Sequence, residues 1–316
     1  MNELLPLIVI VGPTAVGKTE IGVKAAQMID GEIISGDSMQ VYRFMDIGTA
    51  KPSGEEMGGI PHYLIDSIKP DEEFNVAVFQ KLVEKYLVSI HNKGKLPIIV
   101  GGTGLYIRSV IDYYDFTPPG ENPAKRKELR KLSEEQGTEP LVKLLESIDP
   151  VSAGRIHHND TRRLIRALEV YYATGRPISE FQYHSERLPP KYNLAYFGLT
   201  MDRENLYRRI EKRVDVMISR GLVDEVKKLL EMGYGAHHTS MQAIGYKEII
   251  YYLNGICSFE EAVELIKRNT RRFAKRQLTW FRRDSRIKWK DVESYSNFDE
   301  IASEIVSESE GQFGKT

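Results

Sequence analysis

The sequence has little of what disulfide-bonded, cysteine-metal and membrane-spanning proteins require. Cys257 is the only cysteine among 316 residues, which excludes an internal disulfide and a cysteine-caged metal and favours a reducing cytoplasm. No apolar run approaches the ~20 residues that a membrane-spanning helix needs. The short apolar run at residues 7–11 has no basic segment before it and no small-residue cleavage site after it, so it predicts a buried strand rather than a signal peptide.

Net charge is also nearly absent, because 44 Lys and Arg oppose 45 Asp and Glu. The charges are nevertheless unevenly distributed: residues 261–290 contain eleven basic and three acidic residues, and residues 291–316 contain seven acidic residues and one Lys. Such a basic segment favours a polyanionic partner. The alternative is a solvated helix face neutralised by the acidic tail, and composition leaves both open. The content of 41% hydrophobic and 28% charged residues excludes a disordered chain.

Short apolar runs alternate with helical patterns along much of the chain. The predicted strands are residues 7–11, 32–35, 97–100, 196–199 and 287–289, and the predicted helices between them include 19–28 and 79–93. This alternation is typical of an α/β fold in which helices flank a parallel sheet.

A helical insertion interrupts this pattern. Residues 115–195 contain proline-rich breaks and no β-rich run, and their predicted helices are 123–136, 139–147 and 160–174. Asp160 suits the N-cap of the last of these helices and Gly175 its C-terminal cap. We therefore expect a core of residues 1–114 and 196–316 with a helical insertion domain at 115–195.

The first strand leads into a phosphate-binding loop. The pattern G-x-x-x-x-G-K-[ST] is matched by Gly12, Pro13, Thr14, Ala15, Val16, Gly17, Lys18 and Thr19, between a predicted strand and a predicted helix. Backbone N–H groups, the helix N-terminus and Lys18 attract phosphate there, and the Thr19 hydroxyl can hold Mg²⁺. The core is thus expected to be P-loop NTPase-like. The motif predicts a polyphosphate without saying which one.

Two observations weaken the reading of this loop as an ATP or GTP site. Residues 101–104 (GGTG) follow the third strand where a metal-binding Asp would be expected, and no guanine-reading motif is present. Ligands of open α/β sheets bind at the carboxyl ends of the strands, so Thr14, Asp37 and Thr103 should meet in one crevice. Asp37 could hold a metal, accept a proton or cap a turn, and the residues alone leave these roles open.

Several further blocks resemble the tRNA dimethylallyltransferases, also called tRNA isopentenyltransferases. They are DSMQVY at 37–42, MDIGTAKP at 45–52, PHYLID at 61–66, GGTGLY at 101–106, NDTRR at 159–163, QAIGY at 242–246 and KRQLTWFR at 275–282. These blocks occur in the family's order and cover nearly the whole chain. A departure is Gly36, where the family often has a side chain. The chain also lacks the cysteines of the zinc finger that some eukaryotic members carry.

The resemblance implies a reaction. A dimethylallyl group passes from dimethylallyl diphosphate to the exocyclic amine of the adenine 3′ of a tRNA anticodon, and diphosphate leaves. Asp37 would then aim the amine and accept its proton. Lys18, Thr14, the loop N–H groups and a Thr19-bound Mg²⁺ would stabilise the leaving group.

The resemblance also implies that an arginine from the helix after residue 202 holds the diphosphate. Arg213 is the expected residue and Arg209 the alternative. A surface ion pair of this arginine with Glu211 or Asp215 is the competing interpretation.

A larger set would contact the anticodon stem-loop. Its members are Asp37, Ser38, Met39, Gln40 and Thr103; Arg126, Thr161, Arg162, Arg163, Leu164 and Ile165; Met241, Gln242, Ala243, Ile244, Gly245 and Tyr246; and Lys275, Arg276, Gln277, Leu278, Thr279, Trp280, Phe281 and Arg282. Gln40 and Ser38 would read the base edge, or merely form turn hydrogen bonds. Met241 and Tyr246 could stack on bases or lie in the core. Basic residues spaced three to four apart after Arg268 would share one helix face and grip phosphates.

Other functions remain alternatives to this prenyltransferase. One is a small-molecule P-loop kinase with a helical lid, and another is a nucleotide-gated RNA-binding module without catalysis. A third keeps the chemistry but prenylates free AMP, although a mononucleotide needs no long basic face. We expect a cytoplasmic monomer that does not bind membranes.

Overall fold

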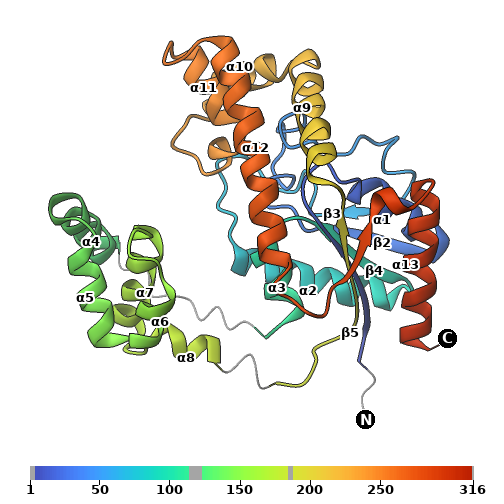
Figure 1. The fold of residues 1–316 in the computed structure, drawn as a ribbon, viewed down its shortest axis with the longest axis horizontal. Coiled ribbons are helices and arrows are strands. Elements are labelled where there is room, and N and C mark those ends of the chain that lie inside the picture. The colour runs from blue at the N-terminus through green and yellow to red at the C-terminus, as the bar shows by residue number, and fades with distance from the viewer. Residues whose placement is uncertain (1–3, 114–122, 184–187, 315–316) are drawn as a thin grey trace. The chain divides into compact units, whose positions relative to one another are not determined.

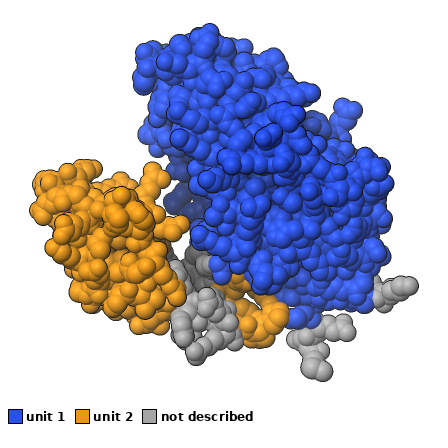
Figure 2. All heavy atoms as spheres, viewed as in Figure 1, with its two compact units in different colours: residues 1–111, 192–316 blue, residues 112–191 orange. Residues whose placement is uncertain are grey.

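The computed structural model describes residues 4–113, 123–183 and 188–314. The chain forms two compact units, coloured separately in Figure 2. The core unit combines Met1–Ile111 with Tyr192–Thr316, and the insertion unit is Asp112–Lys191. None of the helices in the described ranges has both the length and the apolarity needed to cross a bilayer.

A six-stranded, fully parallel sheet forms the centre of the core unit (Figure 1). Its strands are β1 (Pro6–Val11), β2 (Gly31–Ser35), β3 (His62–Tyr63), β4 (Leu96–Gly101), β5 (Asn193–Thr200) and β6 (Lys288–Asp291). The order across the sheet is β3-β2-β4-β1-β5-β6. The predicted parallel α/β core is confirmed. β3 was not predicted, because its two half-buried residues carry no periodic signal.

Helices cover both faces of the sheet. The helices of the core unit are α1 (Lys18–Met28), α2 (Val76–Asn92), α3 (Gly104–Ile111), α9 (Arg203–Ser219), α10 (Leu222–Glu231), α11 (Tyr246–Leu253), α12 (Phe259–Phe281) and α13 (Phe298–Phe313), with short 3₁₀ turns at Ser240–Gln242 and Val292–Ser294. Successive strand residues point to opposite faces. Ile8 and Ile10 therefore pack in the cluster that contains α1 and α13 side chains, and Val9 and Val11 pack in the cluster with α2 and α3.

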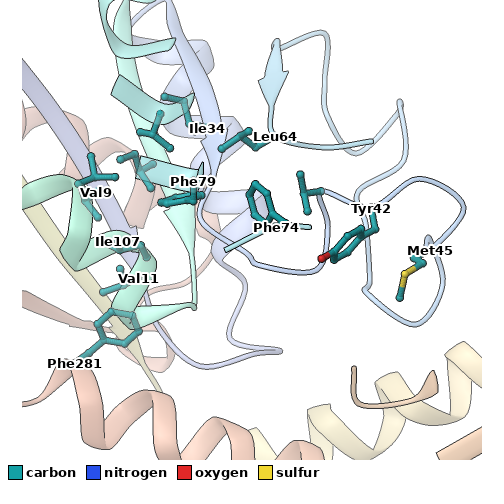
Figure 3. Close-up of a cluster of buried hydrophobic side chains, with 14 of the residues drawn as sticks. Val9, Val11, Ile34, Tyr42, Met45, Leu64, Phe74, Phe79, Ile107 and Phe281 are labelled. Atoms are coloured by element: carbon teal, nitrogen blue, oxygen red, sulfur yellow. The ribbon is translucent and has the colours of Figure 1, made fainter. Parts of the chain in front are cut away.

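The second of these clusters continues beyond the sheet. In Figure 3 it runs from Val9 and Ile34 on the strands, past Phe79 of α2, to Tyr42 and Met45 in the loop after β2. Met45 is fully buried and Tyr42 is 1% exposed. The loop that follows the second strand is thus part of the packed core, which fixes the path of the chain next to Asp37.

The described residues of the insertion unit form helices joined by loops and no strand. Its helices are α4 (Pro123–Gln136), α5 (Glu139–Ile148), α6 (Pro150–Arg155), α7 (Thr161–Thr174) and α8 (Ile178–Tyr183). Leu129, Leu145 and Leu168 belong to a separate hydrophobic cluster. The predicted caps of α7 are confirmed: the Asp160 carboxylate accepts the Arg163 N–H at 3.2 Å, and Gly175 adopts φ 71°. The short helices α6 and α8 were not predicted.

The acidic C-terminal helix pairs with lysines rather than with the arginines of α12. Asp299 of α13 bonds Lys24 of α1 at 2.7 Å, and Glu304 and Glu308 both bond Lys290 of β6. The last two of these carboxylates therefore neutralise Lys288 and Lys290 at the end of the basic segment 261–290, as the alternative interpretation expects, but none of the three pairs with the exposed cations of α12 in the described residues. The exposed cations of α12 stay available to another partner.

Candidate functional site

The phosphate-binding loop joins β1 to α1 in a conformation that its glycines permit. Gly12 and Gly17 have φ of 153° and 107°, a region that is unfavourable for other residues. A Cβ at Gly17 would also lie 2.7 Å from the ring of Phe298, so the start of α13 packs directly on the loop. The Lys18 ammonium folds back and donates a hydrogen bond to the Pro13 carbonyl at 2.7 Å.

A cavity of about 700 Å³ opens in front of this loop, within the core unit. Thr14, Lys18 and Asp37 border it, as does the Gly101–Gly102 turn at the end of β4. Thr103 is not among the lining residues. Its hydroxyl oxygen instead accepts the backbone N–H of Ser38 at 3.1 Å, so it ties the β4 turn to the segment next to Asp37. The carboxyl ends of β1, β2 and β4 thus form one site.

Lys18 and Asp37 are both perturbed by this environment. Desolvation in the cavity and the nearby Arg213 lower the pKa of the Lys18 ammonium to about 7, while Asp37 acts in the opposite direction. Burial raises the pKa of the Asp37 carboxyl, although the Met39 N–H, which Asp37 accepts at 2.8 Å, and Lys18 oppose this rise. Asp37 is therefore a stronger proton acceptor than an exposed aspartate.

One wall of the cavity comes from α9. Arg209, Lys212 and Arg213 of α9 line it together with Arg220, the residue that caps the C-terminus of this helix. Counted from Arg209 they follow at three, four and eleven residues, which places them on one helix face. Arg213 and Arg209 were predicted from the family resemblance, whereas the helical spacing that adds Lys212 and Arg220 was not used. The sequence signal for Lys212 and Arg220 was therefore missed.

Arg213 has no hydrogen-bond or ion-pair partner among the residues that the structure describes. The two acids that could have paired with it are engaged by α12: Glu211 bonds Arg271 at 2.5 Å and Asp215 bonds Lys267 at 2.7 Å. The surface ion pair considered above is therefore wrong. Burial lowers the pKa of Arg213, and the Coulomb attraction of Glu56 opposes this effect. Arg213 is a half-buried cation that borders the same cavity as the phosphate-binding loop.

Another part of the wall is a loop that a half-buried carboxylate holds in place. Glu225 of α10 accepts the backbone N–H groups of three successive residues, 46–48, at 2.8–3.2 Å, and the Tyr246 hydroxyl at 2.6 Å. The Tyr246 ring packs so closely on Gly48 that any side chain there would overlap it. Neither Glu225 nor this role of Tyr246 was predicted, because both depend on a contact between distant segments.

That loop in turn positions Gln40. The Gln40 amide donates weakly to the Ala50 carbonyl at 3.3 Å, and its oxygen accepts the Ser35 hydroxyl at 3.0 Å. Gln40 borders the cavity near Asp37. In this structure its amide is engaged within the protein, as in the simpler interpretation of this residue.

The residues predicted to contact tRNA fall into exposed, half-buried and buried sets. The exposed set is Arg162, Arg163, Gln242, Lys275, Arg276, Thr279 and Arg282; the half-buried set is Asp37, Ser38, Met39, Gln40, Thr103, Arg126, Thr161, Ala243, Ile244, Leu278 and Trp280. The buried set is Leu164, Ile165, Met241, Gly245, Tyr246, Gln277 and Phe281. Side chains of the buried set pack inside their unit and offer no surface to RNA. For Met241 and Tyr246 the core reading is therefore correct, and base stacking is not.

The predicted basic surfaces differ in how their charges are held. On the insertion unit, the buried Glu169 bonds both Arg126 and Arg166, at 2.9 and 3.1 Å. On α12, the cations Arg268, Arg272, Lys275 and Arg276 are exposed, and together with Thr279 we call them the basic face of α12. No group of three or more His, Cys, Asp or Glu side chains in the described ranges could hold a metal ion.

The chain is similar to known proteins over most of its length. The family model "IPP transferase" matches residues 40–284. A tRNA dimethylallyltransferase of Carboxydothermus hydrogenoformans is 57% identical over 302 residues, which are 96% of each chain. A tRNA dimethylallyltransferase of Pelotomaculum thermopropionicum is 53% identical over 310 residues, 98% of each chain.

Solved structures show the same relationship. The tRNA isopentenylpyrophosphate transferase of Bacillus halodurans is 47% identical with a TM-score of 0.73, over 98% of this chain and 96% of that one. A eukaryotic dimethylallyltransferase acting on tRNA is 31% identical with a TM-score of 0.82, over 97% of this chain and 79% of that one. Because the family model covers most of the chain and these relatives match it nearly end to end, the chain belongs to the IPP transferase family of tRNA dimethylallyltransferases.

Proposed function

We propose that this protein transfers a dimethylallyl group from dimethylallyl diphosphate to the exocyclic amine of the adenine 3′ of a tRNA anticodon. A nitrogen–carbon bond forms, the allylic carbon–oxygen bond breaks, and diphosphate leaves. The observation that carries this proposal is that the phosphate-binding loop, the half-buried Asp37 and the half-buried Arg213 all border one cavity. Family membership supplies the reaction that fits these groups.

The proton moves to Asp37 in this mechanism. An adenine amine is a weak nucleophile because its lone pair is delocalised into the ring, so a carboxylate that accepts its hydrogen both aims it and removes the proton. The raised pKa of Asp37 favours that transfer. Gln40 and Ser38, next to Asp37 in the chain, are proposed to contact the base edge.

The leaving group meets fixed positive charge. Negative charge grows on the diphosphate as the allylic bond breaks, and donors already aimed at that charge lower the barrier. Lys18, Arg213 and the loop N–H groups are the proposed donors, with Arg209 as the second arginine of the same wall.

A divalent cation fits beside Thr19. This residue is exposed at the edge of the cavity directly after Lys18. Mg²⁺ commonly uses one or two protein oxygens and completes its shell with water and substrate phosphate, so one hydroxyl is sufficient protein ligation. When bound, the ion would neutralise part of the diphosphate charge.

The basic face of α12 is proposed to bind the phosphates of the anticodon stem-loop, together with the exposed arginines of the insertion unit. Exposed cations at helical spacing suit a polyanion, and a free mononucleotide needs no such surface. The cytoplasmic location and the monomeric state stay predictions of the sequence.

The test is incubation with radiolabelled dimethylallyl diphosphate, Mg²⁺ and an anticodon stem-loop with adenine at the target position. We expect label on the RNA and equimolar diphosphate. A stem-loop with guanine at that position is the control and should stay unlabelled. Parallel reactions with AMP and with ATP test the alternatives. Label on AMP alone, or phosphate transfer from ATP without prenylation, would contradict the proposal.

A further inference from the structure

Gln277 lies in the middle of the sequence block predicted to contact tRNA, but its side chain points into the protein. It is 5% exposed, while its neighbours Lys275 and Arg276 on α12 are exposed. A buried primary amide must find partners for both its oxygen and its nitrogen, because an unpaired polar group inside the protein is costly.

Both partners of Gln277 belong to the cavity. Its oxygen accepts the backbone N–H of Thr14 at 2.9 Å, and its nitrogen donates to the Gly102 carbonyl at 3.0 Å. Because Thr14 offers an N–H donor and Gly102 a carbonyl acceptor, the amide oxygen must face Thr14 and the amide nitrogen must face Gly102. The side chain therefore connects the phosphate-binding loop after β1 to the turn after β4.

The bond to Thr14 reaches Lys18 through one peptide group. The Thr14 N–H and the Pro13 carbonyl are the two ends of the same planar unit. Gln277 holds the N–H end, and the carbonyl end accepts the Lys18 ammonium at 2.7 Å. Rotation of this peptide plane would therefore move the anchor point of Lys18. Gln277 prevents that rotation by tying the plane to the end of β4.

The packing around the amide is tight on the side of Gly102. A Cβ at position 102 would overlap the Gln277 nitrogen, so only glycine lets the amide reach the carbonyl of that residue. Among the described residues, Gln277 is also the one side chain that accepts a backbone N–H of the loop spanning residues 12–17.

We propose that Gln277 is a positioning residue for diphosphate binding: it fixes the Pro13–Thr14 peptide plane, and with it the Lys18 ammonium, against the end of β4. It does not touch the RNA. This assignment rests on the proposed function only in taking diphosphate as the ligand of the loop.

The experiment replaces the amide with an apolar side chain of similar length, Gln277→Met, in the full chain. Inorganic pyrophosphate binding is measured by calorimetry, and the KM values for dimethylallyl diphosphate and for the stem-loop are measured separately. We expect roughly tenfold weaker pyrophosphate binding and a similar rise in the KM for dimethylallyl diphosphate, the order expected when a buried hydrogen-bond pair is lost. The KM for the stem-loop should not change.

The control is Asn269→Ala on the same helix. Asn269 donates to Glu248 of α11 at 2.7 Å and does not border the cavity, so its loss tests the effect of removing an α12 amide contact as such. It should leave pyrophosphate affinity unchanged.

Two outcomes would contradict the proposal. If both variants lose the same stability and neither changes pyrophosphate affinity, Gln277 is only structural. If Gln277→Met raises only the KM for the stem-loop, the residue contacts RNA. Either result overturns the proposal.

A second variant keeps the test available if Gln277→Met does not fold. Gly102→Ala displaces the amide from its other end and should weaken pyrophosphate binding to a similar extent. When both variants fold, their effects should be less than additive, because they remove the same contact. Full additivity would contradict the proposal. The calorimetry needs no turnover, so it stays informative even if no prenyl transfer is found.

Discussion

The cavity and the basic face of α12 are both rich in Lys and Arg, but they hold these charges in different environments. In the cavity, desolvation perturbs the pKa values of Lys18, Asp37 and Arg213. On α12, Arg268, Arg272 and Arg276 are exposed to water. Charges in a low-dielectric site interact strongly, whereas exposed charges are screened within about 10 Å at moderate salt. The comparison teaches that pH should act mainly through the cavity and salt mainly through α12.

The substitution Asp37→Asn should separate the roles of the cavity and of the basic face of α12 most clearly. Transfer should fall by about 10³-fold, because an amide cannot accept the proton that a general base removes. Stem-loop binding should be unchanged, since the charges that grip RNA lie elsewhere. Single-turnover rates and filter binding measure the two effects. Asp224→Asn, an exposed carboxylate on α10, is the matched control and should behave as wild type. Loss of RNA binding in Asp37→Asn would break the comparison.

Arg213→Ala should have the next largest effect. Removing one donor from a desolvated anion site costs roughly a hundredfold in turnover, and pyrophosphate should also bind more weakly. The control is Arg208→Ala on the same helix, whose side chain is 73% exposed and does not border the cavity. Equal effects of the two substitutions would show that α9 charge acts at long range rather than through the cavity.

Lys18 should make anion binding pH-dependent in the neutral range. With a pKa of about 7, its ammonium is lost as the pH rises above 7, so pyrophosphate affinity should fall by up to about tenfold per pH unit. At pH values below 7, pyrophosphate binding should be accompanied by little proton uptake. At pH values well above 7, the uptake should approach one proton. Lys18→Arg keeps its charge over this range and corrects for ionisation of the ligand. A constant ratio of wild-type to Lys18→Arg affinity from pH 6 to 9 would contradict this prediction.

The smallest effects should come from single exposed cations. Arg272→Ala and Arg276→Ala should each raise the KM for the stem-loop a few-fold and leave turnover unchanged. Each lost phosphate contact should reduce the slope of log affinity against log salt by about 0.7–0.9. Lys227→Ala on α10 provides an exposed cation outside this face, for which no change is expected. An unchanged salt slope in both α12 variants would exclude the helix from the RNA surface.

The fold was largely readable from the sequence where signals are local. β1 and β4 are apolar runs, β2 contains the apolar pair Ile33–Ile34, and α7 carries a recognisable cap at each end. Glycine spacing placed the phosphate-binding loop correctly between β1 and α1. The two-residue β3 and the short helices α6 and α8 were missed, because their few residues give no period to count.

The candidate site was readable only in part. Thr14 and Asp37 were expected together because strand ends of a parallel sheet meet at one edge, and both border the cavity. Tyr246 ends the block at 242–246 that resembles the family, and Met241 directly precedes this block, but both residues are fully buried. Their burial could not be inferred from spacing, because apolar side chains suit a base stack and a core equally well.

The sequence by itself determined the alternation of strands and helices, the phosphate-binding loop and the aspartate after the second strand. These features depend on neighbours within a few residues, whose backbone preferences and periodicity are local. Only the tertiary structure decided that Gln277 holds Thr14, from 263 positions away, and that Glu225 holds the loop at residues 46–48. It also decided that Glu211 and Asp215, the acids near Arg213 in the sequence, form ion pairs with Arg271 and Lys267 instead. Which side chains meet across such separations is set by how whole faces are buried, and a linear pattern does not encode that.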